Sequence, residues 1–165
     1  MKKNKSKTKK NSRMKSLRLL KKEAWKLISV HVRSNGADWR GYNRCYTCPH
    51  FSHWRDLDCG HFIHSKLDYD LRNLKPQCAR CNRYLHGNLG VYAERLIIEN
   101  GMPWLQQLKK DSQKGNNYSR QELYAIITKY KNQTISWRGL RTMNTITAAL
   151  ACQTAGMVQA AFGQI

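Results

Sequence analysis

The sequence is short of acidic residues. It holds 10 aspartates and glutamates against 30 lysines and arginines, a formal net charge of +20. This balance argues for a polyanionic partner, with nucleic acid first and an anionic membrane surface second. Residues 1–15 include eight basic residues and no acid. We expect this arm to be disordered in isolation and to lie along phosphates.

Long apolar runs are also missing. Residues 1–10 are polar and basic with no apolar core after them, which argues against a secretory signal peptide. Residues 142–165 carry no charge but are too polar to insert as a spanning helix, which needs about 20 predominantly apolar residues. We therefore expect no membrane partner and a location in the reducing cytoplasm. We assign no role to residues 142–165.

Four of the six cysteines form two Cys-x-x-Cys pairs, and the ligand set they offer is Cys45, Cys48, Cys78 and Cys81. Four thiolates at this spacing predict one tetrahedral zinc ion in a closed, structural site. Zinc binding would then contribute directly to the free energy of folding. His50 and His53 are near enough to compete as ligands, but the four cysteines are preferred. Cys59 and Cys152 remain as free thiols.

Apolar residues at three- and four-residue steps predict helices on both sides of the cysteine pairs. The sequence predicts an α+β class that is mainly helical, with a zinc-containing finger among amphipathic helices. We divide it into a basic arm (1–15), a basic amphipathic helix (16–40), the finger (41–101), a helical scaffold (102–141) and the uncharged tail (142–165).

The finger also carries candidate catalytic residues. A neutral imidazole such as His61 can act as a general base near pH 7. Asn82 directly follows the last zinc cysteine, and His86 lies four residues later, on the same face of an expected helix. An asparagine oxygen and an imidazole could together hold one hard divalent ion against a phosphate.

His61, Asn73 and Asn82, framed by the cysteine pairs, follow the order of the HNH, or His-Me finger, nucleases. The run GHFIHSKLDYDLRNLKPQCARCNRYLHGNLGVYAERLI resembles the phage NinG/Rap family of recombination endonucleases. The resemblance implies a ββα-metal finger with His61 as general base. It also implies that Asn73 positions His61 and that Asn82 binds a catalytic Mg²⁺ or Mn²⁺.

One position departs from the HNH pattern. These nucleases usually place an aspartate before the catalytic histidine, whereas this sequence has Gly60. Side chains alternate along a strand, so Asp58 shares the face of position 60 and could supply the missing ligand. His86 is the alternative. His64 and Asp70 are weaker candidates that we interpret as loop residues.

By resemblance, the substrate is branched recombination DNA such as a Holliday junction, in the bacterial host of a phage. A homodimer is expected, because matched cuts on two strands need two active sites. Two alternatives stay open: a non-catalytic zinc-stapled DNA-binding module, and an HNH nuclease for ordinary duplex. The basic residues expected to contact phosphates are Lys9, Lys10, Arg13, Lys15, Arg18, Lys21, Lys22, Arg80 and Arg83.

Overall fold

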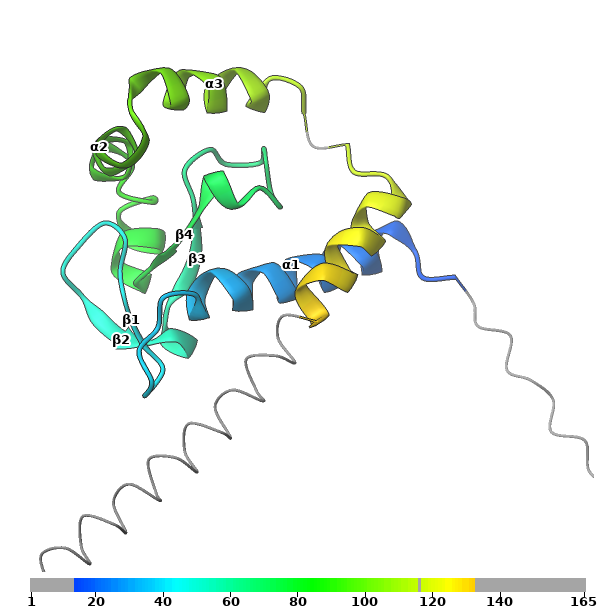
Figure 1. Ribbon diagram of the computed structural model, residues 1–165, viewed down its shortest axis with the longest axis horizontal. Coiled ribbons are helices and arrows are strands. Elements are labelled where there is room, and N and C mark those ends of the chain that lie inside the picture. The colour runs from blue at the N-terminus through cyan, green and yellow to red at the C-terminus, as the bar shows by residue number, and fades with distance from the viewer. Residues whose placement is uncertain (1–13, 116, 133–165) are drawn as a thin grey trace, which may run out of the picture.

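The computed structural model describes residues 14–115 and 117–132 (Figure 1). In this part of the chain, helices outweigh strands, and the strands form two separate two-stranded antiparallel sheets. The mixed, mainly helical class is therefore confirmed. Most of the basic arm, the uncharged tail and Cys152 lie outside the described residues.

The first helix, α1 (Leu17–Ser34), is amphipathic as predicted. It begins at Ser16, whose hydroxyl accepts a hydrogen bond from the backbone N–H of Leu19 at 3.4 Å. Its buried side chains recur every four residues: Leu20, Ala24, Ile28 and Val32. The helix ends at Ser34, and Asn35 and Gly36 stop it as predicted: Asn35 is its C-cap and Gly36 turns the chain with a φ of +76°.

The next element is a hairpin of β1 (Tyr42–Arg44) and β2 (Phe51–His53). The first cysteine pair lies in the loop between these strands. The buried side chain of Asn43 donates to the carbonyl oxygens of Arg33 and Asn35, each at 2.9 Å. One side of the hairpin is thereby fixed to the end of α1.

A short 3₁₀ turn, η1 (Trp54–Asp56), leads to β3 (Asp58–His61). This strand pairs with β4 (Leu74–Gln77), which follows a second 3₁₀ turn, η2 (Leu71–Asn73). The register sets Asp58 opposite Gln77 and His61 opposite Leu74. The pairing therefore sets Asn73, which directly precedes β4, beside His61 at the end of β3.

The segment after the second cysteine pair differs from the expected helix. It forms one π-helical turn, η3 (Arg80–Tyr84), and then a tight turn. His86, Gly87 and Asn88 have φ values of +47°, +88° and +47°. These left-handed conformations end the helical geometry, so the argument that Asn82 and His86 share a helix face is wrong.

Three helices complete the described chain. α2 (Leu89–Asn100) ends at Gly101, and α3 (Met102–Ser112) has Pro103 in its first turn, both as predicted. The last helix, residues 120–132, opens with the predicted capping box. The Ser119 N–H donates to Glu122 Oε2 at 2.7 Å, and the Glu122 N–H donates to Ser119 Oγ at 3.2 Å.

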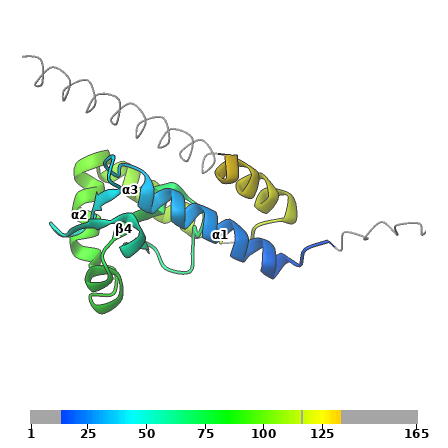
Figure 2. The same ribbon diagram turned by 90° about the horizontal axis from the view of Figure 1, so that it is seen from below.

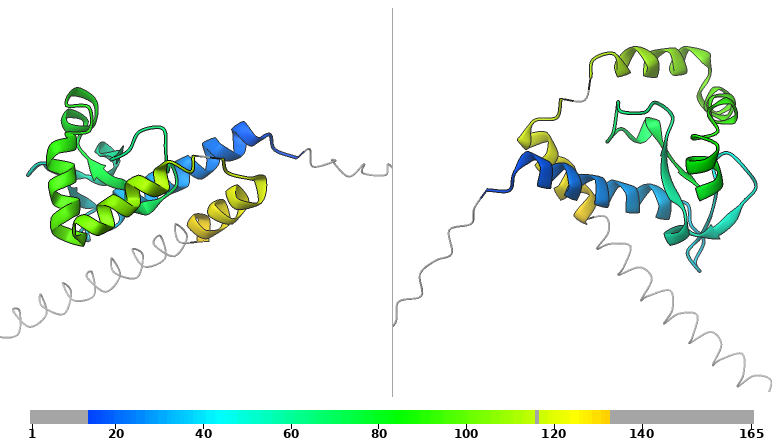
Figure 3. Two further views of the ribbon diagram at one scale, coloured as in Figure 1. Left: turned by 90° about the horizontal axis from the view of Figure 1, so that it is seen from above. Right: turned by 180° about the vertical axis from the view of Figure 1, so that it is seen from behind.

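The core is organised around α1, which lies between the β3–β4 hairpin and the last helix (Figures 1 and 2). Leu20 and Ala24 of α1 pack against Leu123 and Ile127 of the last helix. Both views in Figure 3 show these two helices side by side. On the other side of the molecule, buried residues of α2 and α3 form a second cluster with Tyr46 and Leu67. None of the described helices has the length and apolar character needed to cross a membrane.

Candidate metal centre and active site

The four predicted cysteines converge on one point. Their sulfur atoms all lie within 4.8 Å of one another, and Cys48 Sγ is 3.7 Å from Cys78 Sγ. A regular tetrahedron with Zn–S bonds of about 2.3 Å needs sulfurs about 3.8 Å apart. Among the described residues this is the only group of three or more His, Cys, Asp or Glu side chains that could hold a metal ion. The donor set and its spacing fit zinc.

The surroundings of Cys45 favour a thiolate. Burial raises the pKa of its thiol, but hydrogen bonds from the backbone of Cys78 and Thr47 outweigh this and lower the pKa to about 7. Cys59 behaves in the opposite way, because burial raises the pKa of its thiol to about 12. Cys59 packs with Ile28 and Leu74 in a separate apolar cluster and is not part of the metal centre.

Gln77 connects the two halves of the metal centre. Its fully buried Nε2 donates to Thr47 Oγ1 at 2.8 Å and to the Gly87 carbonyl oxygen at 2.7 Å. The same side chain explains the glycine at position 60. A Cβ atom on Gly60 would lie 2.0 Å from Gln77 Oε1. The position where an HNH nuclease carries an aspartate is therefore occupied by a neighbouring side chain.

Asp58 and Asn82 meet beside the metal centre. Asn82 Nδ2 donates to Asp58 Oδ2 at 3.3 Å, across the space between β3 and η3. Arg83 binds the same carboxylate with two hydrogen bonds of 2.6 and 2.7 Å. This guanidinium is the main reason that the pKa of Asp58 is lowered. Mg²⁺ is commonly held by one or two carboxylates together with substrate phosphate, and the Asp58–Asn82 pair is compatible with that chemistry.

His86 does not complete a cluster of titratable ligands. It is exposed in the turn after η3. Neither His86 nor Asp58 belongs, within the described chain, to a group of three His, Cys, Asp or Glu side chains close enough to hold an ion. Of the three catalytic ligands expected from sequence, the structure brings Asp58 and Asn82 together.

His61 ends β3 on the opposite face from Asp58. Its ring stacks on Trp25 of α1, with centroids 4.9 Å apart and planes inclined by 16°. Nε2 is buried, lies 3.9 Å from Asp68 Oδ1 and makes no hydrogen bond to another described residue. Burial lowers the pKa of His61 more than the Asp68 carboxylate raises it. Burial thus favours the neutral form of the imidazole.

Asn73 closes the loop that follows His61. It is fully buried, and its Oδ1 accepts from the Ile63 N–H at 2.8 Å. Its Nδ2 donates to the carbonyl oxygens of Ile63 and Lys66 at 3.0 and 3.1 Å. The amide thus uses its donors and its acceptor within the chain. This geometry fits a residue that positions the strand end, and it leaves no obvious surface for substrate.

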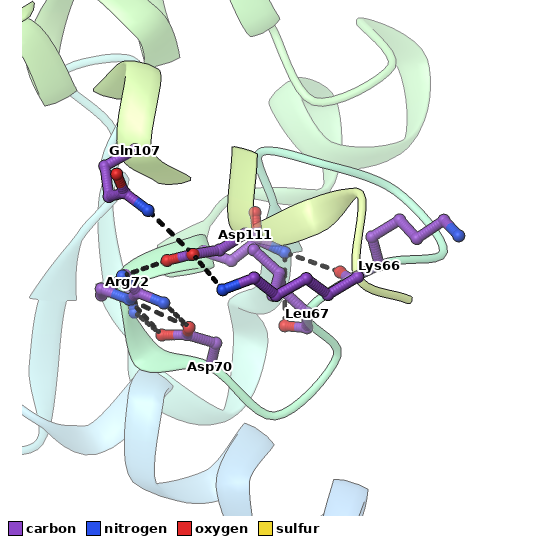
Figure 4. A network of polar contacts seen from close by, with 8 residues as sticks. Lys66, Leu67, Asp70, Arg72, Gln107 and Asp111 are labelled. Carbon is purple, nitrogen blue, oxygen red and sulfur yellow. Dashed lines mark hydrogen bonds and ion pairs between the residues drawn. The ribbon is translucent and has the colours of Figure 1, made fainter. Parts of the chain in front are cut away.

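The adjacent residue, Arg72, anchors the same loop to α3 (Figure 4). It donates to both carboxylate oxygens of Asp70 and to Asp111 Oδ2 at 3.0 Å. Gln107 also donates to Asp111, at 3.0 Å. Asp70 is thus a structural loop residue. His64 is an exposed residue of the same loop.

The basic residues expected to contact phosphates fall into three groups. Lys9, Lys10 and Arg13 lie outside the described residues. Exposed side chains at the start of α1 and in η3 are Lys15, Arg18, Lys21, Lys22 and Arg80. Lys15 pairs with Glu23 at 2.6 Å, and Arg83 is bound to Asp58. Residues three or four apart on a helix are neighbours, so the basic row on α1 leads to Trp25 and from there to His61.

Sequence reasoning missed Trp25, Asp68 and Gln77. Gln77 could have been found from strand alternation, because it precedes Cys78 and lies opposite Asp58 in the register. The contact of Trp25 with His61 depends on how α1 crosses the hairpin, for which the sequence holds no local signal. Asp68 lies in a loop whose path is set by the Asn73 hydrogen bonds.

Comparison with known proteins gives one consistent family. The family model described as Bacteriophage Lambda NinG protein matches residues 1–138. Protein ninG of Salmonella phage P22 is 26% identical over 125 residues, which is 73% of this chain and 59% of that protein. Protein ninG of Escherichia phage 933W and that of Enterobacteria phage VT2-Sa are each 25% identical over 125 residues, with the same coverage. The chain thus spans less than two thirds of the length of these relatives, and no solved structure matches it.

Proposed function

The chain belongs to the NinG family of phage proteins, and we propose that it is a metal-dependent, structure-selective DNA endonuclease. The observation that carries the proposal is a buried imidazole at one end of β3 and, at the other, a carboxylate, Asp58, that accepts a hydrogen bond from the amide of Asn82. Phosphodiester hydrolysis needs a base for water and charge stabilisation for the leaving oxygen.

His61 is the general base in this proposal. It takes a proton from the attacking water as a bond forms between the water oxygen and phosphorus. The bond from phosphorus to the leaving sugar oxygen breaks in the same displacement. Trp25 and the Asn73-closed loop orient the imidazole. The lowered pKa of His61 keeps it unprotonated at neutral pH.

Asp58 and Asn82 would hold the catalytic Mg²⁺ or Mn²⁺, which when bound stabilises negative charge on the leaving oxygen. In-line displacement places the attacking and leaving oxygens on opposite sides of phosphorus, so the phosphate has to lie between His61 and the ion. Arg83 must release Asp58 before an ion binds, and its side chain is 66% exposed and able to move toward a phosphate.

Substrate choice in this proposal rests on DNA shape, because no described residue of the site forms a dedicated base-reading surface. The exposed basic row of α1 supplies phosphate contacts. The substrate is a branched recombination intermediate such as a Holliday junction. Two copies of the chain act together, because paired cuts on two strands need two active sites.

One observation favours a non-catalytic alternative. Arg83 already neutralises Asp58, so the pair could be a structural ion pair in a zinc-stapled DNA-binding module. A nuclease for ordinary duplex is the other alternative, since the catalytic residues alone do not select a branched substrate.

Cleavage of a synthetic four-way junction and of a matched linear duplex tests these possibilities. The zinc-loaded protein is assayed with Mg²⁺, with Mn²⁺ and without an added divalent ion. We expect junction cutting that requires an added ion. His61→Ala should abolish it, whereas the matched variant His50→Ala, which removes an exposed histidine from the loop between β1 and β2, should retain it.

The outcomes separate the three functions. Tight junction binding without cutting under either ion would support the binding module and refute the nuclease. Equal cutting of junction and duplex would refute structure selectivity. Full activity in His61→Ala, with zinc content and folding unchanged, would show that His61 is not the general base.

A further inference from the structure

The outer face of the β1–β2 hairpin exposes aromatic rings that the core does not use. The exposed fractions are 83% for Trp39, 44% for Phe51 and 39% for Tyr42. Large aromatic side chains usually supply core or interface area, and a cluster of them at the surface indicates a binding site. Asn43, between them in sequence, is buried and fixed to α1, so the strand's alternation holds Tyr42 outward.

Arginines are interleaved with these rings. The guanidinium carbon of Arg40 lies 5.6 Å from the Trp39 ring centroid and 5.5 Å from that of Tyr42. That of Arg44 lies 5.5 Å from Phe51. The rings of Tyr42 and Phe51 are themselves 5.6 Å apart. The result is a continuous row of rings flanked by cations.

The row extends toward the candidate active site. Trp54, in η1, has the guanidinium carbons of Arg55 and Arg33 at 4.8 and 5.5 Å from its ring centroid. Arg33 also donates to the Leu57 carbonyl oxygen at 3.1 Å, directly before Asp58. Along the chain, η1 joins the hairpin to β3, whose first residue is Asp58.

We propose that this surface, formed by Trp39, Arg40, Tyr42, Arg44, Phe51 and Arg55, binds unpaired nucleotides by stacking bases on its rings and pairing phosphates with its arginines. We call it the hairpin face. Rings and cations interleaved in this way are what binding of single-stranded nucleic acid requires, because stacking works on any base and arginine contacts the backbone.

Charge selects this occupant over a second copy of the chain. The acid that follows α1, Asp38, already accepts from the Tyr42 N–H at 2.8 Å and pairs with Arg40 at 3.2 Å. Self-association through the hairpin face would bring like charges together at short range. A polyanion with exposed base faces can pair its phosphates with the arginines and stack its bases on the aromatic rings.

Unpaired nucleotides are favoured over duplex because a duplex already stacks its bases on one another. The faces of bases become available at ends, gaps and branch points. The proposal therefore deepens the proposed function: it rests on DNA being the ligand, and it assigns to the hairpin face the recognition of opened bases at a branch. It does not depend on cleavage.

Equilibrium binding of an oligo(dT) strand and of a blunt hairpin duplex tests the proposal, measured by fluorescence anisotropy without an added divalent ion. Trp39→Ala and Phe51→Ala should each weaken oligo(dT) binding at least about fivefold, because stacking on one ring contributes about 1–3 kcal/mol per base. Binding of the duplex should change less than twofold. The matched control is Tyr124→Ala, which removes an aromatic ring of similar exposure (40%) from the last helix.

Trp39→Phe separates stacking from a structural effect. It should keep the affinity for oligo(dT) while the quenching of tryptophan fluorescence on binding decreases. Unchanged oligo(dT) affinity in Trp39→Ala and Phe51→Ala would overturn the proposal, as would equal losses for strand and duplex. If junctions are cut but the hairpin-face variants bind oligo(dT) normally, the proposed nuclease function is supported and the hairpin-face proposal is refuted. If oligo(dT) binding depends on the hairpin face but no junction is cut, the hairpin-face proposal is supported and the nuclease function is refuted.

Discussion

The Gln77 side chain fills the space that a Cβ atom on Gly60 would require, with its Oε1 only 2.0 Å from that position. The two residues lie on paired strands, β3 and β4. Gln77 is held by Thr47 and Gly87, so it cannot swing away without breaking two buried hydrogen bonds. A side chain at position 60, such as the aspartate of the HNH pattern, would therefore clash with Gln77, and the carboxylate beside Asn82 is that of Asp58.

Restoring the acid should fail for the same reason. Gly60→Asp is expected to lower the free energy of unfolding by about 1–3 kcal/mol through overpacking, without increasing cleavage. The double variant with Gln77→Ala should cost less than the sum of the two single changes, because it relieves the clash. Denaturant unfolding of all four proteins measures this coupling. Strictly additive losses would show that Gln77 does not exclude the side chain.

Metal removal should unfold the finger. Cys78→Ser is expected to lose zinc and the cooperative thermal transition, because zinc binding and folding are coupled in small metal sites. Cys59→Ala is the matched control: it removes a buried thiol outside the metal centre and should keep one zinc per chain. Zinc content and circular dichroism melts report both effects. Native melting of Cys78→Ser would contradict a structural role for the metal.

Asn73→Ala should destabilise the protein by at least about 2 kcal/mol. The change leaves the Ile63 N–H and the Lys66 carbonyl oxygen without their partner, and unsatisfied buried groups cost about 1–3 kcal/mol each. Asn100→Ala, which removes one hydrogen bond to Leu96 at an exposed helix end, should cost less than about 1 kcal/mol. Urea unfolding compares the two. Equal losses would argue against Asn73 as the residue that closes the loop.

His61 should titrate below its ordinary pKa of 6.5, since burial against Trp25 disfavours the imidazolium. Between the folded pKa and 6.5 the unfolded chain binds more protons, so stability is present above pH 6.5 and is lost as pH falls. His31 contributes in the same direction, because burial also lowers its pKa. NMR titration of the His61 ring, assigned with His61→Gln, gives the value, and zinc content is followed in parallel because protons compete for thiolates.

Trp25→Ala should expose the imidazole and move the pKa of His61 upward, toward 6.5. The pH at which cleavage reaches half its maximum should rise with it, since the base must be unprotonated. A His61 pKa that stays unchanged in Trp25→Ala would show that burial by this ring is not the cause.

Arg83→Gln tests the competition for Asp58. Removing the guanidinium should tighten binding of Mn²⁺ to the Asp58–Asn82 pair, because the carboxylate loses its charged partner. The same change should weaken DNA binding if Arg83 moves to a phosphate in the complex. Arg80→Gln removes an exposed charge from the same turn and should weaken DNA binding without changing ion affinity. Equal Mn²⁺ affinity in wild type and Arg83→Gln would show that Arg83 does not compete with a metal ion for Asp58.

The features that followed from the sequence depend on local spacing. The two Cys-x-x-Cys pairs predicted the sulfur cluster, and the apolar steps of α1, α2 and the last helix predicted their buried faces. The relations that did not follow join residues distant in the chain. The stacking of His61 on Trp25 and the ion pair of Asp58 with Arg83 exist only after α1 and η3 have docked on β3. The π-helical turn η3 is followed by a left-handed turn that begins at His86. The spacing of apolar residues in the sequence predicts neither of these backbone conformations.

The packing of the last helix on α1 also bears on the order in which the chain folds. Arg120 donates a hydrogen bond to the Lys15 carbonyl oxygen, 105 residues earlier, so this contact closes nearly the whole described chain into one loop. Closing a long loop costs conformational entropy that grows with the logarithm of its length. A zinc ion that joins the two cysteine pairs shortens this loop by about a third. Because the dependence is logarithmic, that shortening lowers the closure cost by well under about 1 kcal/mol, so the metal acts on the stability of the finger far more than on the meeting of α1 and the last helix.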